Sequence, residues 1–414
     1  MSTFLKVLFI LMALKLIVHV YIPNGNNVCK TFTDYYFPEG NENCYYDPDG
    51  LLETPELIKK YAGVVETHEV TSEDGYVLTM FRIPAPNPKG VILIHHSIAT
   101  YSQVYFFQGN DSLAITLWRN GFDVWLANQR GTSYSNRHVN MTKRDYGYWN
   151  FSFHEMGIYD VSSELELIRE KTNNSQITYF GHSLGGTIGL VYASLKSFDA
   201  AKYLKNMVLV TPATTMQSPT ITYGIGKILF PILEFVTNIL QSGSPLIGLH
   251  FIVAASRIFM RFFPPIQIIA VLLLWFLCGF TPEETDPTFF SFDAFMYLNN
   301  YSWKTLFHFV QLIGSSHFKM YDYGLENNVE VYGNGSAPLY PLENIMVPTL
   351  IISSARDVLV PQIDCENVFG KLSQQAKLYG HWKISELNHL DFLAGLSRQK
   401  VVFERLAFLL KTDL

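Results

Sequence analysis

The chain has 414 residues, of which 48% are hydrophobic, 15% are aromatic and only 16% are charged. This composition excludes a disordered protein, because such large apolar surfaces have to be buried or used to bind an apolar ligand. The formal net charge of −6, without a run of lysines and arginines, argues against nucleic acid as a partner. The length fits either one large domain or a core that carries an insertion.

The first 22 residues have the pattern of an export segment. In residues 1–22, Lys6 precedes a strongly apolar stretch, as in a secretory signal peptide. Lys15 interrupts the stretch and no clean A-x-A motif follows, so a retained signal-anchor is the alternative. A buried N-terminal core helix is a further reading.

Six N-x-S/T sequons, more than chance provides, favour the secretory pathway: Asn110, Asn140, Asn150, Asn173, Asn300 and Asn334. We predict a secreted protein, with the lysosomal lumen or a membrane anchor formed by residues 1–22 as alternatives.

Four cysteines are present, and none belongs to a C-x-x-C motif or to a Cys/His cluster with metal-ligand spacing. A metal site is therefore not expected. In an oxidising compartment Cys29 and Cys44 are placed to close a short loop within the N-terminal extension, residues 23–50. Four cysteines allow three pairings, and free buried thiols are the alternative.

From about residue 65 the sequence predicts alternating strands and helices. Residues 66–72 and 76–84 flank Glu73-Asp74-Gly75 and are expected to form an antiparallel hairpin. The apolar run 91–94 is typical of a strand buried on both faces. A helix at 112–120, closed by Gly121, a strand at 122–126 and a helix at about 157–171 continue a β-α-β order.

Two further buried strands are predicted at 207–210 and 349–352, and the chain between them is too long for one crossover. We therefore expect residues 215–335 to form an inserted, mainly helical cap or lid between two parts of a core, 51–214 and 336–414. The apolar run 266–280 is shorter than the roughly 20 residues of a membrane span, so we expect a buried or interfacial cap helix. Pro264-Pro265 should stop this helix on its N-terminal side.

The pentapeptide Gly181-His182-Ser183-Leu184-Gly185 lies between the apolar strand 177–180 and the plausible helix 187–195. A nucleophile elbow requires this strand–turn–helix context. The glycines allow a strained turn, and the N-terminus of the following helix offers N–H groups to an oxyanion. Ser183 is therefore the candidate nucleophile.

A serine nucleophile needs a histidine base that is oriented by a carboxylate, and α/β-hydrolases carry these residues in the order Ser, acid, His. Asp357 directly follows the strand 349–352, and His389 lies in a loop near the C-terminus. They are the candidate acid and base.

Other residues compete for these two roles. His381 falls inside a probable strand and is better explained as a structural or surface histidine. Asp364 is expected to be a helix-cap or surface charge, and Asp391 to hydrogen-bond locally. His96 precedes Ser183 in the chain, so loop support is the favoured reading for it.

Ordered motifs along residues 50–410 resemble the acid lipase family, which contains the gastric and lysosomal acid lipases and many insect relatives. These motifs are TPELI at 54–58, HEV at 68–70, EDGY at 73–76, SLA at 112–114, FDVWLAN at 122–128 with RG at 130–131, FSFHEM at 151–156 with YD at 159–160, YDYG at 321–324 and HLDF at 389–392. The resemblance implies an α/β-hydrolase core, a cap with a movable lid, and hydrolysis of triacylglycerol or sterol esters without any cofactor. It also supports Ser183, Asp357 and His389, and it implies an oxyanion hole formed by the backbone N–H groups of Ile98 and Leu184. Asp160 and Arg130 match the family and are otherwise explained as buried structural partners.

Three departures from the family pattern stand out. Ser97 occupies a position where glycine is usual, and serine adopts glycine's backbone angles only under strain. Leu184 replaces a frequent glutamine, with a smaller expected effect because only its main chain would contribute. Residues 299–302 stand where a Gly-Thr-Ser segment is usual in the family, in the expected cap.

We therefore predict a serine esterase that acts on neutral lipid esters at a lipid–water interface. The alternative is a lipid-binding or carrier protein that retains the lipase fold but is catalytically impaired by the change at Ser97.

Overall fold

The computed structural model describes residues 25–174, 176–240, 243–245, 260, 263–291 and 298–412. The predicted export segment, residues 1–22, lies outside these residues. Within the part of the chain that is described, no helix is long and apolar enough to cross a membrane.

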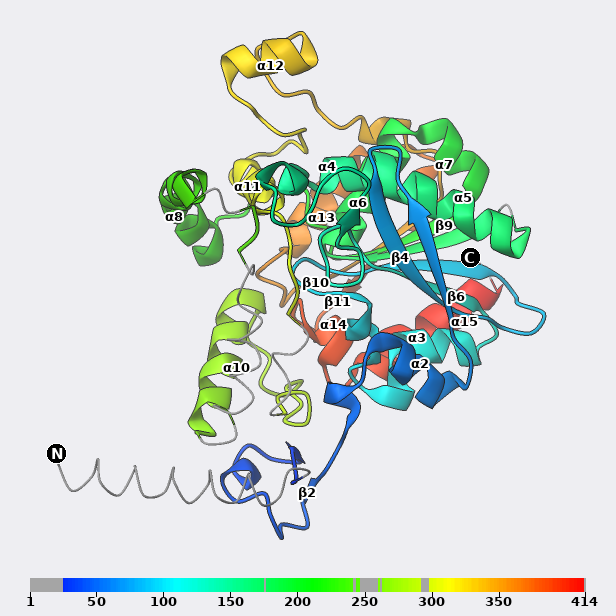
Figure 1. Cartoon of the computed structure of the whole chain (residues 1–414), viewed down its shortest axis with the longest axis vertical. Helices are drawn as coiled ribbons and strands as arrows, with labels where there is room; N and C mark the ends of the chain where they lie inside the picture. The colour runs from blue at the N-terminus through cyan, green and yellow to red at the C-terminus, as the bar shows by residue number, and fades with distance from the viewer. Residues whose placement is uncertain are drawn as a thin grey trace, which may run out of the picture.

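A mixed, largely parallel sheet forms the centre of the molecule (Figure 1). Its strands are β3 (Glu66–Thr71), β4 (Tyr76–Ile83), β5 (Val91–His95), β6 (Asp123–Ala127), β8 (Ile177–His182), β9 (Leu204–Val210), β10 (Thr349–Ser354) and β11 (His381–Ile384), with the short β7 (Arg137–His138) beside β4. They are ordered β11-β10-β9-β8-β5-β6-β4-β3. All pairs from β11 to β6 are parallel, whereas β4 pairs antiparallel with both β6 and β3.

The register joins segments that are far apart in the sequence. Leu209 of β9 lies opposite Ile351 of β10, so the two strands on either side of the long intervening segment are direct neighbours. The predicted hairpin is confirmed, with Thr71 opposite Val77. Gly75 in its turn has a φ of 95°, a backbone angle that glycine adopts without strain.

Helices cover both faces of the sheet, which explains why its central strands are continuously apolar. One face packs on α2 (Thr54–Ala62), α3 (Leu113–Arg119) and α15 (Glu404–Thr412). The other face packs on α5 (Val161–Thr172), α6 (Leu184–Leu195), α7 (Ser197–Tyr203) and α13 (Gln362–Lys371). Strand residues alternate between the two cores: Leu93 faces the second group of helices and Ile94 the first.

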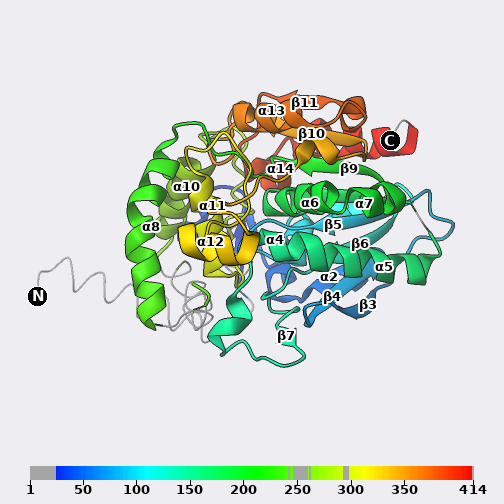
Figure 2. The same ribbon diagram turned by 90° about the horizontal axis from the view of Figure 1, so that it is seen from above.

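The described part of the segment between β9 and β10 forms helices and contributes no strand to this sheet. They are α8 (Ile221–Leu240), α10 (Pro265–Cys278), α11 (Trp303–Leu312) and α12 (Leu325–Tyr332). Figures 1 and 2 show them gathered on one side of the molecule, beside the sheet. Pro265 is the first residue of α10, a position where proline is tolerated because the first helical N–H groups lack an intrahelical partner.

The N-terminal extension forms a small unit of its own. Its strands β1 (Val28–Cys29) and β2 (Cys44–Tyr45) are antiparallel, and Cys29 is disulfide-bonded to Cys44. Cys278 and Cys365 are free and buried. The extension packs on Met260 and, through Phe32, on the ring of Phe290.

Five of the six sequon asparagines are exposed: Asn110, Asn140, Asn150, Asn173 and Asn334. Asn300 is buried, and Ser302 of the same sequon caps α11 by accepting the N–H of Lys304. The folded chain therefore does not present the sequon at Asn300 for modification.

Candidate active site

Ser183 lies in the turn between β8 and α6. Its φ of 55° and ψ of −117° are a conformation that residues other than glycine adopt only under strain. A Cβ atom on Gly181 would come within 2.4 Å of the Gly185 carbonyl oxygen, and one on Gly185 within 2.3 Å of the His95 carbonyl oxygen. Both glycines of the pentapeptide are therefore sterically required.

Backbone hydrogen bonds hold Ser183 at the carboxyl end of the sheet. Its N–H donates to the Val210 carbonyl at 2.9 Å, and its carbonyl accepts the N–H of Thr187 at 3.1 Å. Leu184 is the first residue of α6 and is buried. Its N–H belongs to the first turn of the helix, where N–H groups lack an intrahelical partner and favour an anion.

Asp357 and His389 meet on loops beside Ser183. His389 Nδ1 donates to Asp357 Oδ2 at 2.7 Å. Asp357 Oδ1 accepts the N–H groups of Leu359 at 3.0 Å and Val360 at 2.8 Å. Both oxygens of the buried carboxylate are thus fixed, which holds Nδ1 of the imidazole as a donor and leaves Nε2 as its acceptor.

Ser183 and His389 line one cavity of about 230 Å³. Its further walls are largely apolar and include Ile98, Ala270, Leu274, Phe289, Phe290 and Leu298. Among the described residues no hydrogen bond joins the Ser183 hydroxyl to His389, and in ligand-free enzymes such bonds often tighten only when substrate is present. An apolar cavity with two convergent polar groups suits an apolar ligand with one reactive polar centre.

The loop that carries Ile98 rests on His96. His96 Nε2 accepts the N–H of Gln129 at 3.0 Å, and its Nδ1 donates to the Ser97 carbonyl at 2.9 Å. Burial lowers the pKa of His96 to about 3, so the ring stays neutral, as this pattern of one acceptor and one donor requires. His96 supports the loop and is fully engaged in doing so.

The strain expected at Ser97 is absent. Ser97 is not among the residues with a positive φ, and its hydroxyl contacts the hydroxyl of Thr100 at 3.2 Å. The positive φ in this loop, 59°, belongs to Ala99. The expectation that serine here would distort the loop was wrong, because the left-handed backbone angle falls two residues later.

Asn299 ties the inserted segment to the same loop. Its N–H donates to the Ala99 carbonyl at 2.8 Å, and its side-chain oxygen accepts the N–H of Ser133 at 2.9 Å. The segment that departs from the family pattern therefore anchors the loop that carries Ile98.

The competing residues have other partners. His381 Nε2 forms a hydrogen bond of 2.7 Å with the Ser353 hydroxyl, between the neighbouring strands β11 and β10. Asp391 accepts the N–H of Asn388 at 2.8 Å, as expected for a local hydrogen bond. Asp364 was expected to be a cap or surface charge, but it is buried and accepts the N–H of Gln217 at 3.1 Å, so it anchors the start of the inserted segment.

Two neighbours of His389 were missed by sequence reasoning. Thr211 Oγ1 lies 3.3 Å from His389 Nδ1, and His182 Nε2 donates to the His389 carbonyl at 3.2 Å. Burial lowers the pKa of His182, which keeps it neutral. The sequence signal that could have found them is their position, since His182 immediately precedes Ser183 and Thr211 immediately follows β9.

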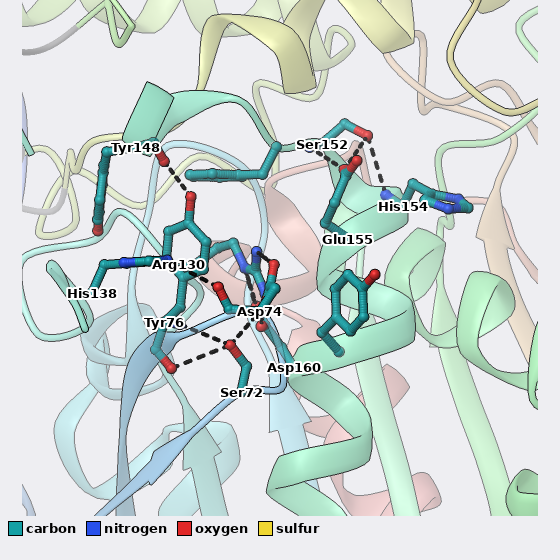
Figure 3. A network of polar contacts seen from close by, with 12 residues as sticks. Ser72, Asp74, Tyr76, Arg130, His138, Tyr148, Ser152, His154, Glu155 and Asp160 are labelled. Carbon is teal, nitrogen blue, oxygen red and sulfur yellow. Dashed lines mark hydrogen bonds and ion pairs between the residues drawn. The ribbon is translucent and has the colours of Figure 1, made fainter. Parts of the chain in front are cut away.

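Arg130 and Asp160 form the buried structural pair that the sequence suggested (Figure 3). Arg130 Nε lies 2.9 Å from Asp160 Oδ2, and Nη1 lies 2.6 Å from Oδ2 of Asp74, a third partner that was not foreseen. The guanidinium also stacks on the ring of Tyr76, 3.9 Å from its centroid. This network joins the β3–β4 turn to the helix that carries Asp160, and none of its members lines the cavity of Ser183.

Known proteins match the chain along most of its length. The family described as "alpha/beta hydrolase fold" matches residues 90–236, and the one described as "partial alpha/beta-hydrolase lipase region" matches residues 54–109. Lipase member K of Homo sapiens is 29% identical over 88% of this chain and 92% of its own. Lipase 1 of Drosophila melanogaster is 28% identical over 86% of this chain and 79% of its own. Gastric triacylglycerol lipase of Mus musculus is 26% identical over 89% of this chain and 93% of its own. The predicted resemblance is thereby confirmed: the chain has the α/β-hydrolase fold and is similar over most of its length to these lipases.

Proposed function

We propose that the chain is a lipase that hydrolyses neutral lipid esters, triacylglycerol among them, with Ser183, His389 and Asp357 as its catalytic triad. The observation that carries this proposal is the shared cavity: Ser183 and His389 face one apolar space, and Asp357 fixes the histidine from behind.

In the first half of the reaction the Ser183 hydroxyl attacks the ester carbonyl carbon. His389 Nε2 takes the hydroxyl proton as the Oγ–C bond forms, and the carbonyl oxygen becomes an oxyanion. Asp357 stabilises the imidazolium through Nδ1. The imidazolium then protonates the leaving alcohol oxygen, which leaves an acyl-enzyme on Ser183.

In the second half, His389 removes a proton from water, and the resulting hydroxide attacks the acyl carbonyl. Collapse of this second intermediate breaks the bond to Oγ, returns the proton to Ser183 and releases the fatty acid. The backbone N–H groups of Ile98 and Leu184 hold the oxyanion in both halves, one from the loop on His96 and one from the start of α6.

The inserted segment, residues 215–335, serves as the cap in this proposal. One face of α8 exposes Ile221, Ile225, Ile228, Ile232, Phe235 and Ile239 at helical spacing. An exposed apolar stripe of this kind fits a lipid–water interface. The disulfide between Cys29 and Cys44 supports an oxidising, secretory location, as do the exposed sequons.

A substrate panel tests the proposal. Purified protein and its Ser183→Ala variant are compared on emulsions of tri-, di- and monoacylglycerol and cholesteryl ester and on a soluble short-chain ester, across pH. We expect fatty acid release from at least one long-chain neutral ester by the wild type alone. Binding of these lipids without turnover by the folded wild type would contradict the proposal and favour a carrier.

A further inference from the structure

The C-terminal end of the cap helix α10 contacts both loops that carry the proposed acid and base. We propose that Thr281 and Asn388 are positioning residues, which lock this end of the cap onto the His389 loop and so set the orientation of the imidazole. This inference rests on the proposed function of the triad, and it assigns a mechanical role to residues that do not line the cavity.

A single carbonyl group holds the two loops together. The Cys278 carbonyl, at the last residue of α10, accepts the N–H of Val358 at 3.2 Å and the N–H of His389 at 3.3 Å. Val358 directly follows Asp357. The relative position of acid and base is therefore fixed by a backbone group of the cap as well as by their own hydrogen bond.

The chain after α10 approaches the acid loop so closely that only glycine fits. A Cβ atom on Gly279 would lie 2.0 Å from the Arg356 carbonyl oxygen and 3.1 Å from Asn388 Cβ. Gly279 also has a φ of 124°, which residues with a Cβ avoid. The contact is thus a dedicated fit between the cap and the catalytic loops.

A short relay of buried side chains completes the contact. Asn388 Nδ2 donates to the Gly279 carbonyl at 3.0 Å and to Thr281 Oγ1 at 2.7 Å. The buried Thr281 hydroxyl in turn donates a hydrogen bond to Asp391 Oδ2 at 2.6 Å. Asp391 Oδ2 also accepts the backbone N–H of Asn388 at 2.8 Å. Each donor of the relay has an acceptor, so these hydrogen bonds fix the orientation of the Asn388 and Thr281 side chains.

The relay places His389 between two fixed points. Asn388 immediately precedes the histidine, and the Asn388 side-chain oxygen accepts the N–H groups of Leu390 at 2.8 Å and Asp391 at 3.0 Å on its far side. Loss of the Thr281 hydroxyl removes one of two partners from the Asn388 side-chain N–H₂ group and one of two from Asp391 Oδ2, in a buried place. We expect the loop then to relax and the imidazole of His389 to shift relative to Ser183.

Thr281→Val removes the hydroxyl at nearly constant volume, and Thr281→Ser retains it. Active sites are counted by fluorophosphonate titration, and kcat and KM are measured on a soluble short-chain ester. We expect Thr281→Val to lower kcat per titrated site by about 10- to 100-fold with little change in KM, because small misplacements of a catalytic group have effects of this size. Thr281→Ser restores the rate.

The division between kcat and KM, together with rescue by Thr281→Ser, separates positioning from folding. A folding defect lowers the number of titrated sites, whereas a misplaced imidazole lowers kcat at each site that remains. Asn388→Ala, which removes the relay on its other side, is expected to show the same loss of kcat per titrated site. Thr285→Val is the matched control, because the Thr285 hydroxyl bonds to Trp275 and to the Thr281 carbonyl and not to the His389 loop.

An unchanged kcat per titrated site in both relay variants would overturn the inference, even if their melting temperatures fall. A wild type that fails to react at Ser183 would instead contradict the proposed function, and this inference with it.

Discussion

Two of the buried polar clusters in the described part of the chain both pair a base with carboxylates, and they differ in what surrounds that pair. Around Arg130, the guanidinium contacts Asp74 and Asp160 and stacks on Tyr76 (Figure 3). None of these residues lines the Ser183 cavity. Around His389, the imidazole uses Nδ1 on Asp357 and borders the cavity beside Ser183.

The difference shows why burial and ion pairing are poor guides to function on their own. Burial raises the pKa of Asp160 to about 7 while Arg130 opposes the rise, which is a large perturbation at a structural site. What marks the second cluster is a hydrogen-bonding group left over beside a space that a ligand can enter. We expect substitutions in the first cluster to act on stability and those in the second to act on rate.

The largest effect is expected from Asp357→Asn. The amide no longer holds His389 in the tautomer that accepts at Nε2, and a substitution of this kind in a catalytic triad lowers kcat by about 10⁴-fold. The oxygen that accepts from Leu359 and Val360 can remain, so the melting temperature should stay close to that of the wild type. Steady-state kinetics and thermal unfolding check both statements. A variant that is unfolded would contradict the expectation that this cluster acts on rate and not on stability.

Arg130→Met should show the opposite behaviour. Removing one partner of a buried ion pair leaves uncompensated carboxylates and costs about 3–5 kcal/mol of the free energy of unfolding. Denaturant unfolding measures this loss, and kcat per titrated active site should be unchanged. A fall in kcat with full stability would place Arg130 in the catalytic machinery and break the comparison.

Asp391→Asn sharpens the comparison at a carboxylate that lies beside the second cluster and is expected to act on stability. Burial raises the pKa of Asp391 to about 6 from an ordinary value of 3.8, with Glu284 and Glu283 adding to the rise. The folded state therefore binds the proton more tightly than the unfolded state, so this group adds stability below about pH 4 and loses that contribution as pH rises through 6. Unfolding free energies between these values should decline in the wild type and decline less in the variant. An equal decline of the unfolding free energy with pH in both proteins would contradict the raised pKa of Asp391.

The smallest effects concern the loop that carries Ile98. Ala99 has the left-handed backbone angle, which costs a residue with a Cβ about 1–2 kcal/mol, so Ala99→Gly should be neutral or stabilise by up to about 1 kcal/mol. Ser97 has no such angle, and Ser97→Gly should destabilise slightly through the entropy of the unfolded chain. Melting curves of the two variants test this order of stability. A larger gain in stability for Ser97→Gly than for Ala99→Gly would indicate that the strain lies at Ser97.

Much of the core could be predicted from the sequence because its signals are local and redundant. The strands β5, β8, β9 and β10 are short apolar runs bounded by turn residues, and the glycines beside Ser183 mark the elbow. The order of Ser183, Asp357 and His389 then indicated which loops meet, and the structure brings the last two into direct contact.

Contacts of the inserted segment could not be predicted in this way. The hydrogen bond from Asn299 to Ala99 and those from Val358 and His389 to the Cys278 carbonyl join backbone groups that are far apart in the chain, and backbone groups carry no sequence signature. The expectation of strain at Ser97 was wrong for a related reason. A glycine that is usual in the family indicates a left-handed backbone angle in this loop but does not show which residue adopts it, and here it is Ala99.

The central claim is that Ser183 is the group left reactive in its cavity. The direct test is incubation of folded protein with an active-serine fluorophosphonate, followed by peptide mass spectrometry and assay of residual ester hydrolysis. The account predicts one adduct, on Ser183, with loss of hydrolysis in proportion to labelling, and no adduct in Ser183→Ala or after denaturation. Full ester hydrolysis in Ser183→Ala, or a folded wild type that is never labelled at Ser183, would contradict it.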